Sequence, residues 1–146
     1  MIPHLFSRLP GALIALSLCG LASAASAAEL QLQINKIADR NGALHVFVFT
    51  APSGFPAEAS ASLHHVQNGP HEASVKLKLD VPESKEYALM VYQDKNGDGR
   101  MNRFLGMIPQ EPYALSRNPK VIGKPSFADS AVHPAVDELI VLDLRD

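Results

Sequence analysis

Short segments of alternating apolar and polar residues run through most of the chain, and this pattern predicts β-strands with one buried and one solvated face. The clearest is ASVKLKLDV at residues 73–81, in which Val75, Leu77, Leu79 and Val81 form the apolar side. The segment ELQLQINKI at 29–37 alternates in the same way. Weaker patterns predict three further short strands, at 61–67, 127–132 and 138–144.

Two segments are apolar on both faces, and such segments are expected in the interior of a sheet. These are ALHVFVFT at 43–50 and EYALMVYQ at 86–93. The turn-forming residues DRNG at 39–42 separate the first of them from the strand at 29–37. We therefore expect 29–37 and 43–50 to pair as a hairpin, with 43–50 as the central strand.

The spacing of these segments decides the expected fold class. Strands recur about every ten residues with turn chemistry between them, and no convincing helical periodicity is present after residue 28. The sequence therefore predicts an all-β protein, an antiparallel β-sandwich of six or seven strands. A long irregular loop segment at 94–126 interrupts it, and long loops in compact domains tend to be functional or disordered.

The N-terminal segment has the features of a secretory signal peptide. Arg8 supplies a positive charge, residues 11–22 form an apolar stretch, and Ser26-Ala27-Ala28 offers a small-residue cleavage site before Glu29. The apolar stretch is too short for a membrane span, which needs roughly 20 residues. We expect a signal peptide at 1–28, a single β-sandwich domain at 29–146 with no membrane span, and a periplasmic or secreted location.

Composition narrows the chemistry that the mature chain can perform. The single cysteine, Cys19, lies within the predicted signal peptide, so the mature chain has no disulfide and no thiolate ligand or nucleophile. The whole chain carries 13 basic and 15 acidic residues, and removing Arg8 leaves 12 basic ones. There is no basic field for nucleic acid or an anionic membrane.

The strongest candidate for a site is the turn that follows the predicted strand at 86–93. Asp94, Asn96 and Asp98 present oxygens at alternate positions, Gly99 permits a sharp bend, and Asn102 adds a fourth oxygen. This matches the first half of a calcium-binding loop. Leu105 stands where such a loop ends in a bidentate glutamate, so any site is weak, with a dissociation constant of roughly 0.1 to 1 mM.

The same residues have a second interpretation that involves no metal. Asn96-Gly97 and Asp98-Gly99 are favoured dipeptides of tight turns, because their residues tolerate positive φ. The Asp94 side chain can accept hydrogen bonds from backbone amides further along the turn. A cation site and a simple turn both remain open, and Glu111 can join either only if the chain folds back.

Other chemistry has less support in the sequence. His64, His65 and His71 are near one another in sequence, but adjacent residues of a strand point to opposite faces, which argues against a shared metal ion. No nucleophile motif is present. A hydrolase would have to rely on loop carboxylates, and the candidates are Asp94, Asp98, Glu111 and Asp129.

A series of short motifs in a fixed order connects the chain to a known family. It comprises Tyr87-Ala88, Asp94-x-Asn96-x-Asp98-Gly99, Asn102, Gly106, Pro109, Glu111-Pro112-Tyr113, Ser116, Asn118 and Gly123-Lys124-Pro125-x-Phe127-x-Asp129. The chain thereby resembles the bacterial exported family called domain of unknown function 2141. It departs at Gln93, where a histidine is usual, and at Leu115, where an aromatic residue is usual. The resemblance implies an exported sandwich of the transthyretin-like (prealbumin-like) or carboxypeptidase-regulatory-like kind and no particular chemistry.

Two classes of function follow as hypotheses. The first is a non-enzymatic binding or accessory module of the cell envelope, with a weak Ca²⁺ clip in the 94–102 loop and a small ligand or an envelope protein as its partner. The alternative is a hydrolase that acts on envelope material through the loop carboxylates. A concave site where Asp98, Glu111 and Asp129 converge favours the hydrolase, and a hydrogen-bonded loop favours the binding module.

Overall fold

The computed structural model describes residues 26–135 and 138–146, and it is built mainly of β-strands. One sheet has three strands in the order β4-β1-β9, formed by Ser74–Pro82, Ala27–Asn35 and Leu139–Asp143. The other has four in the order β3-β2-β5-β8, formed by Leu63–Gln67, Ala43–Phe49, Ala88–Asp94 and Tyr113–Leu115. The prediction of an all-β fold is confirmed.

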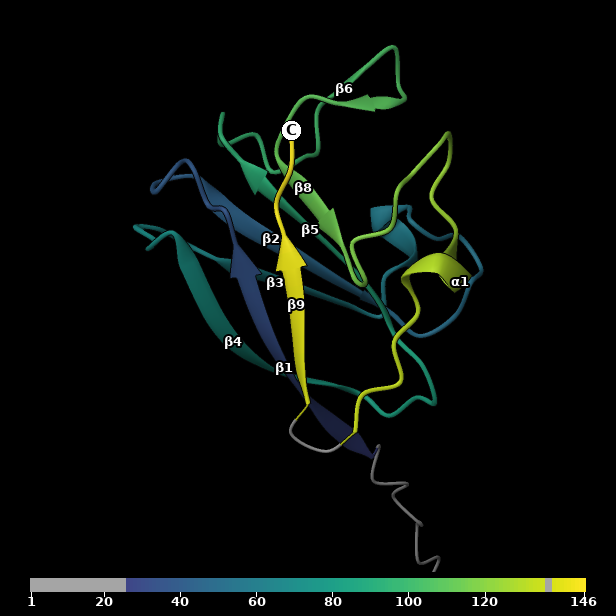
Figure 1. Cartoon of the computed structure of the whole chain (residues 1–146). Coiled ribbons are helices and arrows are strands. Elements are labelled where there is room, and N and C mark those ends of the chain that lie inside the picture. Colours follow the sequence, from purple (N-terminus) through teal and green to yellow (C-terminus); the bar gives the residue numbers. More distant parts are fainter. Residues whose placement is uncertain (1–25, 136–137) are drawn as a thin grey trace, which may run out of the picture.

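The remaining elements are short and lie outside these sheets. The strands β6 (Arg103–Phe104) and β7 (Ile108–Pro109) form a two-stranded ribbon. A 3-10 helix, η1, spans Glu58–Ser60, and a four-residue helix, α1, spans Phe127–Ser130. Figure 1 shows the ribbon beyond one end of the sheets and α1 beside the four-stranded sheet.

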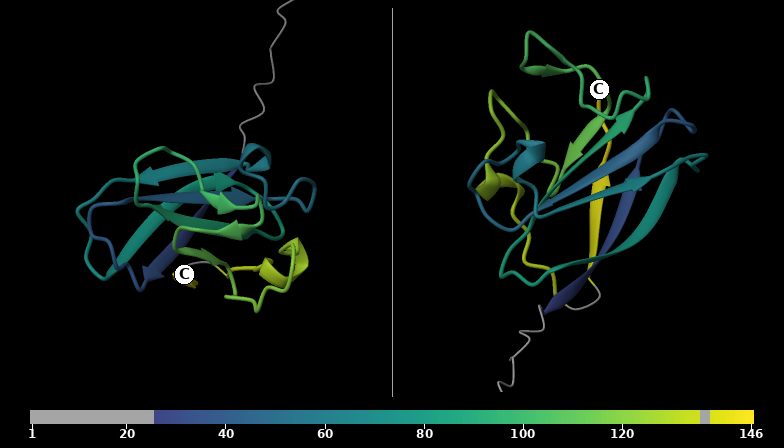
Figure 2. Two further views of the ribbon diagram at one scale, coloured as in Figure 1. Left: turned by 90° about the horizontal axis from the view of Figure 1, so that it is seen from above. Right: turned by 180° about the vertical axis from the view of Figure 1, so that it is seen from behind.

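The two sheets face each other across one hydrophobic core. The strands β1, β4 and β9 contribute Leu32, Leu79 and Leu142, and β2 and β5 contribute Val46 and Leu89. Each of these side chains is buried. Figure 2 shows the two layers in views from above and from behind. Since the alternate residues of one strand face opposite sides, only half of β2 and β5 is covered by this core.

A second apolar cluster covers the other face of the four-stranded sheet. Phe49 and Tyr92 from that face pack with Phe55, Met101 and Phe127 from the connecting segments. The rings of Phe49 and Phe55, and those of Phe55 and Phe127, meet edge to face at 5.0 and 5.7 Å. Because both faces are covered, all seven residues of β5 are buried, which confirms its predicted interior position between β2 and β8.

The predicted hairpin between 29–37 and 43–50 is wrong. β1 pairs with β4 and β9 in one sheet, whereas β2 pairs with β3 and β5 in the other. The connection therefore passes from one layer to the other. A physical reason is visible in the two patterns: β1 has one wet face and suits an outer layer, while β2 is apolar on both faces and needs cover on each.

Three further expectations are corrected. β9 runs parallel to β1, so the sandwich is not wholly antiparallel. The segment predicted as a strand at 127–132 begins as α1, because the Ser126 hydroxyl accepts a hydrogen bond from the Asp129 amide and caps a helical turn. The predicted irregular segment 94–126 contains β6, β7 and β8, and β8 pairs with β5.

The predicted signal peptide falls largely outside the described residues, which begin at Ser26. Ala27 and Ala28, next to the expected cleavage site, are the first residues of β1 and pair with Pro82 and Val81 of β4. No helix in the described ranges is long and apolar enough to cross a membrane.

Replacing Leu89 by alanine tests the interior position of β5. Leu89 is fully buried in the core between the sheets, so we expect the free energy of unfolding to fall by about 2 to 5 kcal/mol. Urea unfolding measures the change. Leu139→Ala, at a side chain that is 40% exposed, is the control and should cost under about 1 kcal/mol. Equal effects of the two substitutions would contradict the described burial of β5.

Candidate functional site

The last residue of β5, Asp94, organises the turn that follows it. Its carboxylate is buried, and its two oxygens accept hydrogen bonds from the amides of Gly97 at 2.7 Å and Gly99 at 2.8 Å. Both glycines have positive φ, 75° and 72°, which side chains disfavour. The His45 imidazole lies 3.7 Å from the same carboxylate. Asp94 therefore determines the path of the chain through residues 95–99.

Glu111 folds back and closes the loop from the other side. Its side chain is buried, and its oxygens accept hydrogen bonds from the amides of Lys95 at 3.0 Å and Asn102 at 3.2 Å. The Gln110 amide also donates to the Asn102 carbonyl at 2.8 Å. Hydrogen bonds to a charged acceptor are stronger than hydrogen bonds between neutral groups. The two buried carboxylates therefore hold the backbone of residues 94–111, and this segment is here called the carboxylate-held loop.

Asn96, Asp98 and Asn102 form a cluster on the exposed side of this loop. One Asp98 oxygen accepts from the amide groups of Asn102 at 3.0 Å and Asn96 at 3.2 Å, and the other accepts from the Arg100 backbone at 2.9 Å. The Asn102 hydrogen bond is the main reason that the pKa of Asp98 lies below its usual value, and the Arg100 amide contributes next. The cluster is thus ordered by its own hydrogen bonds.

The structure separates the four predicted calcium ligands into two groups. Asn96, Asp98 and Asn102 converge within hydrogen-bond distance, whereas Asp94 faces the backbone amides of the turn. No group of three or more His, Cys, Asp or Glu side chains in the described ranges is arranged to hold a metal ion. Glu111 joins the loop by folding back, as the sequence required if it was to take part at all.

A stack of rings supports Asp94 on the outer face of the four-stranded sheet. The His45 ring lies between Tyr92, at 4.8 Å, and His64, at 5.2 Å, and Phe47 stacks on His64 at 4.2 Å. His45 Nδ1 and His64 Nε2 are 3.0 Å apart. Partial burial of the ring, followed by the neighbouring His45, lowers the pKa of His64. The stack holds His45 beside the Asp94 carboxylate.

His64, His65 and His71 lie in different surroundings, as the alternation of side chains along a strand predicts for the adjacent pair. His64 is exposed on the outer face, whereas the Nε2 atom of its neighbour His65 is buried. His71 is buried, with its Nε2 3.1 Å from the Gly42 carbonyl. The three histidines therefore do not share one site.

The Gln93 side chain connects the end of β5 to the turn between β1 and β2. The side chain is fully buried, and its amide group donates hydrogen bonds to the carbonyls of Asp39 and, at 3.4 Å, Gly42. These contacts attach the turn between β1 and β2 to the end of β5. Gln93 is a structural residue here.

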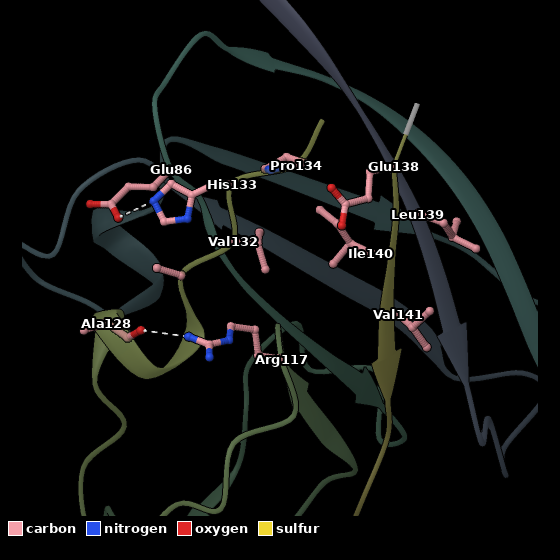
Figure 3. A pocket seen from close by; sticks show the side chains of 11 residues that line it. Glu86, Arg117, Ala128, Val132, His133, Pro134, Glu138, Leu139, Ile140 and Val141 are labelled. Carbon is pink, nitrogen blue, oxygen red and sulfur yellow. Dashed lines mark hydrogen bonds and ion pairs between the residues drawn. The ribbon is translucent and has the colours of Figure 1, made fainter. Parts of the chain in front are cut away.

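The carboxylates proposed for a hydrolase are not brought together. Asp98 and Glu111 are linked through Asn102, but Asp129 lies in α1 and lines a separate small hollow with Lys120 and Lys124. A groove of about 670 Å³ lies elsewhere, between β9 and residues 128–134. Figure 3 shows its polar contacts, Glu86 with His133 at 3.3 Å and Arg117 with the Ala128 carbonyl at 3.5 Å.

Sequence reasoning missed one prominent feature of the carboxylate-held loop. The ribbon of β6 and β7 exposes Phe104, Leu105, Met107 and Ile108, by 55, 74, 76 and 58%. The signal was present in the sequence as FLGMI, four large apolar residues within a loop rich in Gly, Asn and Pro. Apolar residues gathered in a loop are as informative as polar ones when folding does not bury them.

Comparison with known proteins identifies the family. The model of the family described as "Uncharacterized protein conserved in bacteria (DUF2141)" matches residues 32–139. The match covers more than half of the chain, so the protein belongs to this family, as its motifs indicate. No curated protein and no solved structure gives a match.

The role of Glu111 can be tested by replacing it with glutamine. Glutamine has one acceptor oxygen where the carboxylate has two, so one of the amides of Lys95 and Asn102 loses its partner. We expect a loss of about 1 to 3 kcal/mol in urea unfolding. Glu72→Gln, at a side chain that is 84% exposed, is the matched control and should change stability by under about 0.5 kcal/mol. If Glu111→Gln behaves like this control, Glu111 does not hold the loop.

Proposed function

We propose that this protein is a non-enzymatic binding or accessory module of the bacterial cell envelope, exported by its N-terminal segment, and that the carboxylate-held loop is its contact surface. The observation that carries the proposal is that one set of side chains holds the backbone of the loop and another set forms its surface. Asp94 and Glu111 point inward and hold the backbone, while residues 95–110 present their side chains outward, apart from the buried Met101. A surface that is ordered before binding loses little conformational entropy when a partner arrives.

The proposal includes a sandwich of the transthyretin-like kind. It is supported by two facing sheets of three and four strands and by the family to which the chain belongs. Such a scaffold carries many unrelated functions, so the function depends on the loop and not on the fold.

A hydrolase of envelope material is the alternative, and the same hydrogen bonds argue against it. A catalytic carboxylate needs an oxygen within reach of the substrate. Both oxygens of Asp94 and both oxygens of Glu111 accept backbone amides, and both residues are buried. This arrangement favours a structural role for the two carboxylates and supports the binding module.

A weak calcium clip in the 94–102 loop is the second part of the proposal. Asn96 and Asn102 direct amide groups at one oxygen of the exposed Asp98. Rotating either amide by half a turn exchanges its nitrogen for its oxygen, which would place neutral oxygens beside the carboxylate. Asp94 has lone pairs beyond those used by the glycine amides. These oxygens suit Ca²⁺, which accepts irregular oxygen coordination.

Calcium should therefore raise the melting temperature of the mature protein. At ten times the dissociation constant the gain is about 1.4 kcal/mol, or on the order of 3 to 7 °C for a domain of this size. Magnesium should do less, because it requires a smaller octahedral shell. Asp98→Asn should remove most of the shift, whereas Asp80→Asn, an exposed carboxylate on β4, should preserve it. No shift at roughly 10 mM calcium, or an unchanged shift in Asp98→Asn, would leave the loop as a turn only.

The contact surface itself is tested by photocrosslinking in bacterial cells. A photoreactive phenylalanine derivative replaces Met107 in the loop, and Ile122 is the matched control, since the two side chains are 76 and 87% exposed. Mass spectrometry identifies any product, whether protein, lipid or another envelope component. We expect a defined product from position 107 and none from position 122. The absence of any product from 107, or the same products from both positions, would contradict the proposed contact surface.

A further inference from the structure

The ribbon of β6 and β7 ends in an apolar tip, defined here as Phe104, Leu105, Met107 and Ile108. These four are half of the large apolar side chains exposed in the described residues, and they fall within five consecutive positions. None of them belongs to either hydrophobic core. Figures 1 and 2 show the ribbon projecting beyond the ends of both sheets. The tip is convex and stands clear of the body of the protein.

Buried residues hold the chain at both ends of the ribbon. Met101 is buried in the second core before the ribbon begins, and Glu111 is buried where it ends. Phe104 pairs with Ile108, and the Met107 amide donates to the Phe104 carbonyl at 3.2 Å. The ribbon is therefore anchored at both ends, and its turn is closed by a backbone hydrogen bond.

The turn at the tip shows that folding alone does not account for its residues. Leu105 has φ of 52° and Gly106 has φ of 72°. A leucine in the left-handed region is strained, and Asn or Gly would form this turn at lower cost and with better solubility. Leu105 is nevertheless 74% exposed. The tip thus combines a strained backbone with exposed apolar side chains. Strain of this kind indicates a role other than stabilising the fold.

Most of the exposed charged side chains of the carboxylate-held loop are basic. Lys95, Arg100 and Arg103 are exposed in the carboxylate-held loop, and Asp98 is the exposed acidic residue among them. Asp94 and Glu111 are buried and accept backbone amides. Among the exposed side chains of the loop, three cations therefore stand beside one anion, while the two buried carboxylates bring the formal charge of residues 94–111 to zero. An anionic surface would approach the exposed basic side chains more closely than the two carboxylates that balance them, because those carboxylates are buried.

We propose that the apolar tip inserts into the interface of a bilayer that contains anionic phospholipid. Phe104 is the strand residue between Arg103 and the turn at Leu105-Gly106, so the turn begins roughly 7 Å beyond Arg103 at about 3.3 Å per residue. This length matches the roughly 5 to 10 Å to which apolar side chains enter the boundary between headgroups and acyl chains. The basic residues would then lie at the level of the lipid phosphates. The inference rests on the proposed function and names the partner of the same loop.

The order of apolar and charged residues favours a lipid surface over a protein partner. A bilayer presents an anionic headgroup layer and, beneath it, hydrocarbon. The exposed basic side chains near the start of the ribbon match the first layer, and the apolar tip matches the second. A protein partner would instead need a concave apolar pocket with an acidic rim. That occupant is an outcome of the tests below and would overturn the proposal.

The first test is sedimentation of the mature protein with vesicles in the presence of a chelator, so that calcium cannot bridge Asp98 to phosphate. We expect binding to vesicles of phosphatidylcholine and phosphatidylglycerol, and weaker binding to phosphatidylcholine alone. Leu105→Asn removes an apolar side chain from a turn that asparagine accepts readily, so the variant should fold and bind about tenfold more weakly. Ile122→Asn, at a side chain that is 87% exposed, should bind like the parent.

The second test measures insertion directly and does not depend on loss of binding. The chain contains no tryptophan, so Phe104→Trp introduces a single fluorescent reporter at the tip. Its emission should shift to the blue when anionic vesicles are added, and lipids brominated near the headgroup end of the acyl chain should quench it. Ile122→Trp is the control and should show neither effect.

The outcomes separate this inference from the proposed function. Absence of sedimentation with anionic vesicles overturns the membrane proposal, as does an unshifted emission of the Phe104→Trp variant or an equal loss in Leu105→Asn and Ile122→Asn. If position 107 nevertheless crosslinks to a protein in cells, the loop remains a contact surface with a different partner. If position 107 gives no product, the proposed function fails as well.

Discussion

The burial of β5 on both faces is the constraint on which the rest of the structure depends. All seven of its residues are buried, which requires a layer on each side of the strand. The three-stranded sheet supplies one layer, and the segments around Phe55, Met101 and Phe127 supply the other. Covering a strand on both faces removes a large apolar area from water, and it also places the end of the strand at a buried position.

That buried end explains the carboxylate-held loop. Asp94 is the last residue of β5, and its charged carboxylate has little access to water. Without hydrogen-bond partners, a buried charge at this position would lower the stability of the fold. The amides of Gly97 and Gly99 satisfy it, and Glu111 satisfies the amides that the resulting turn leaves open. The loop is thus ordered by groups that face inward. The side chains of the apolar tip, on its outward face, belong to neither hydrophobic core.

Much of the fold and part of the site could be predicted, and the errors have common causes. Alternation located β1, β4 and β9, and apolar residues on both faces identified β2 and β5 as interior strands. Local patterns carry no information about partners, so the hairpin of β1 with β2 was wrong and the parallel pairing of β9 was missed. β8 was missed because its three residues are too short to show a period.

The sequence by itself determined the strand faces, the turn residues at 94–99 and membership of the family, because side-chain period and turn chemistry are local properties. Only the tertiary structure decided that Asp94 turns inward while Asn96, Asp98 and Asn102 converge outside, and that Glu111 returns to close the loop. It alone left Phe104, Leu105, Met107 and Ile108 uncovered. Contacts between residues far apart along the chain depend on which layers meet, and a local pattern does not encode that.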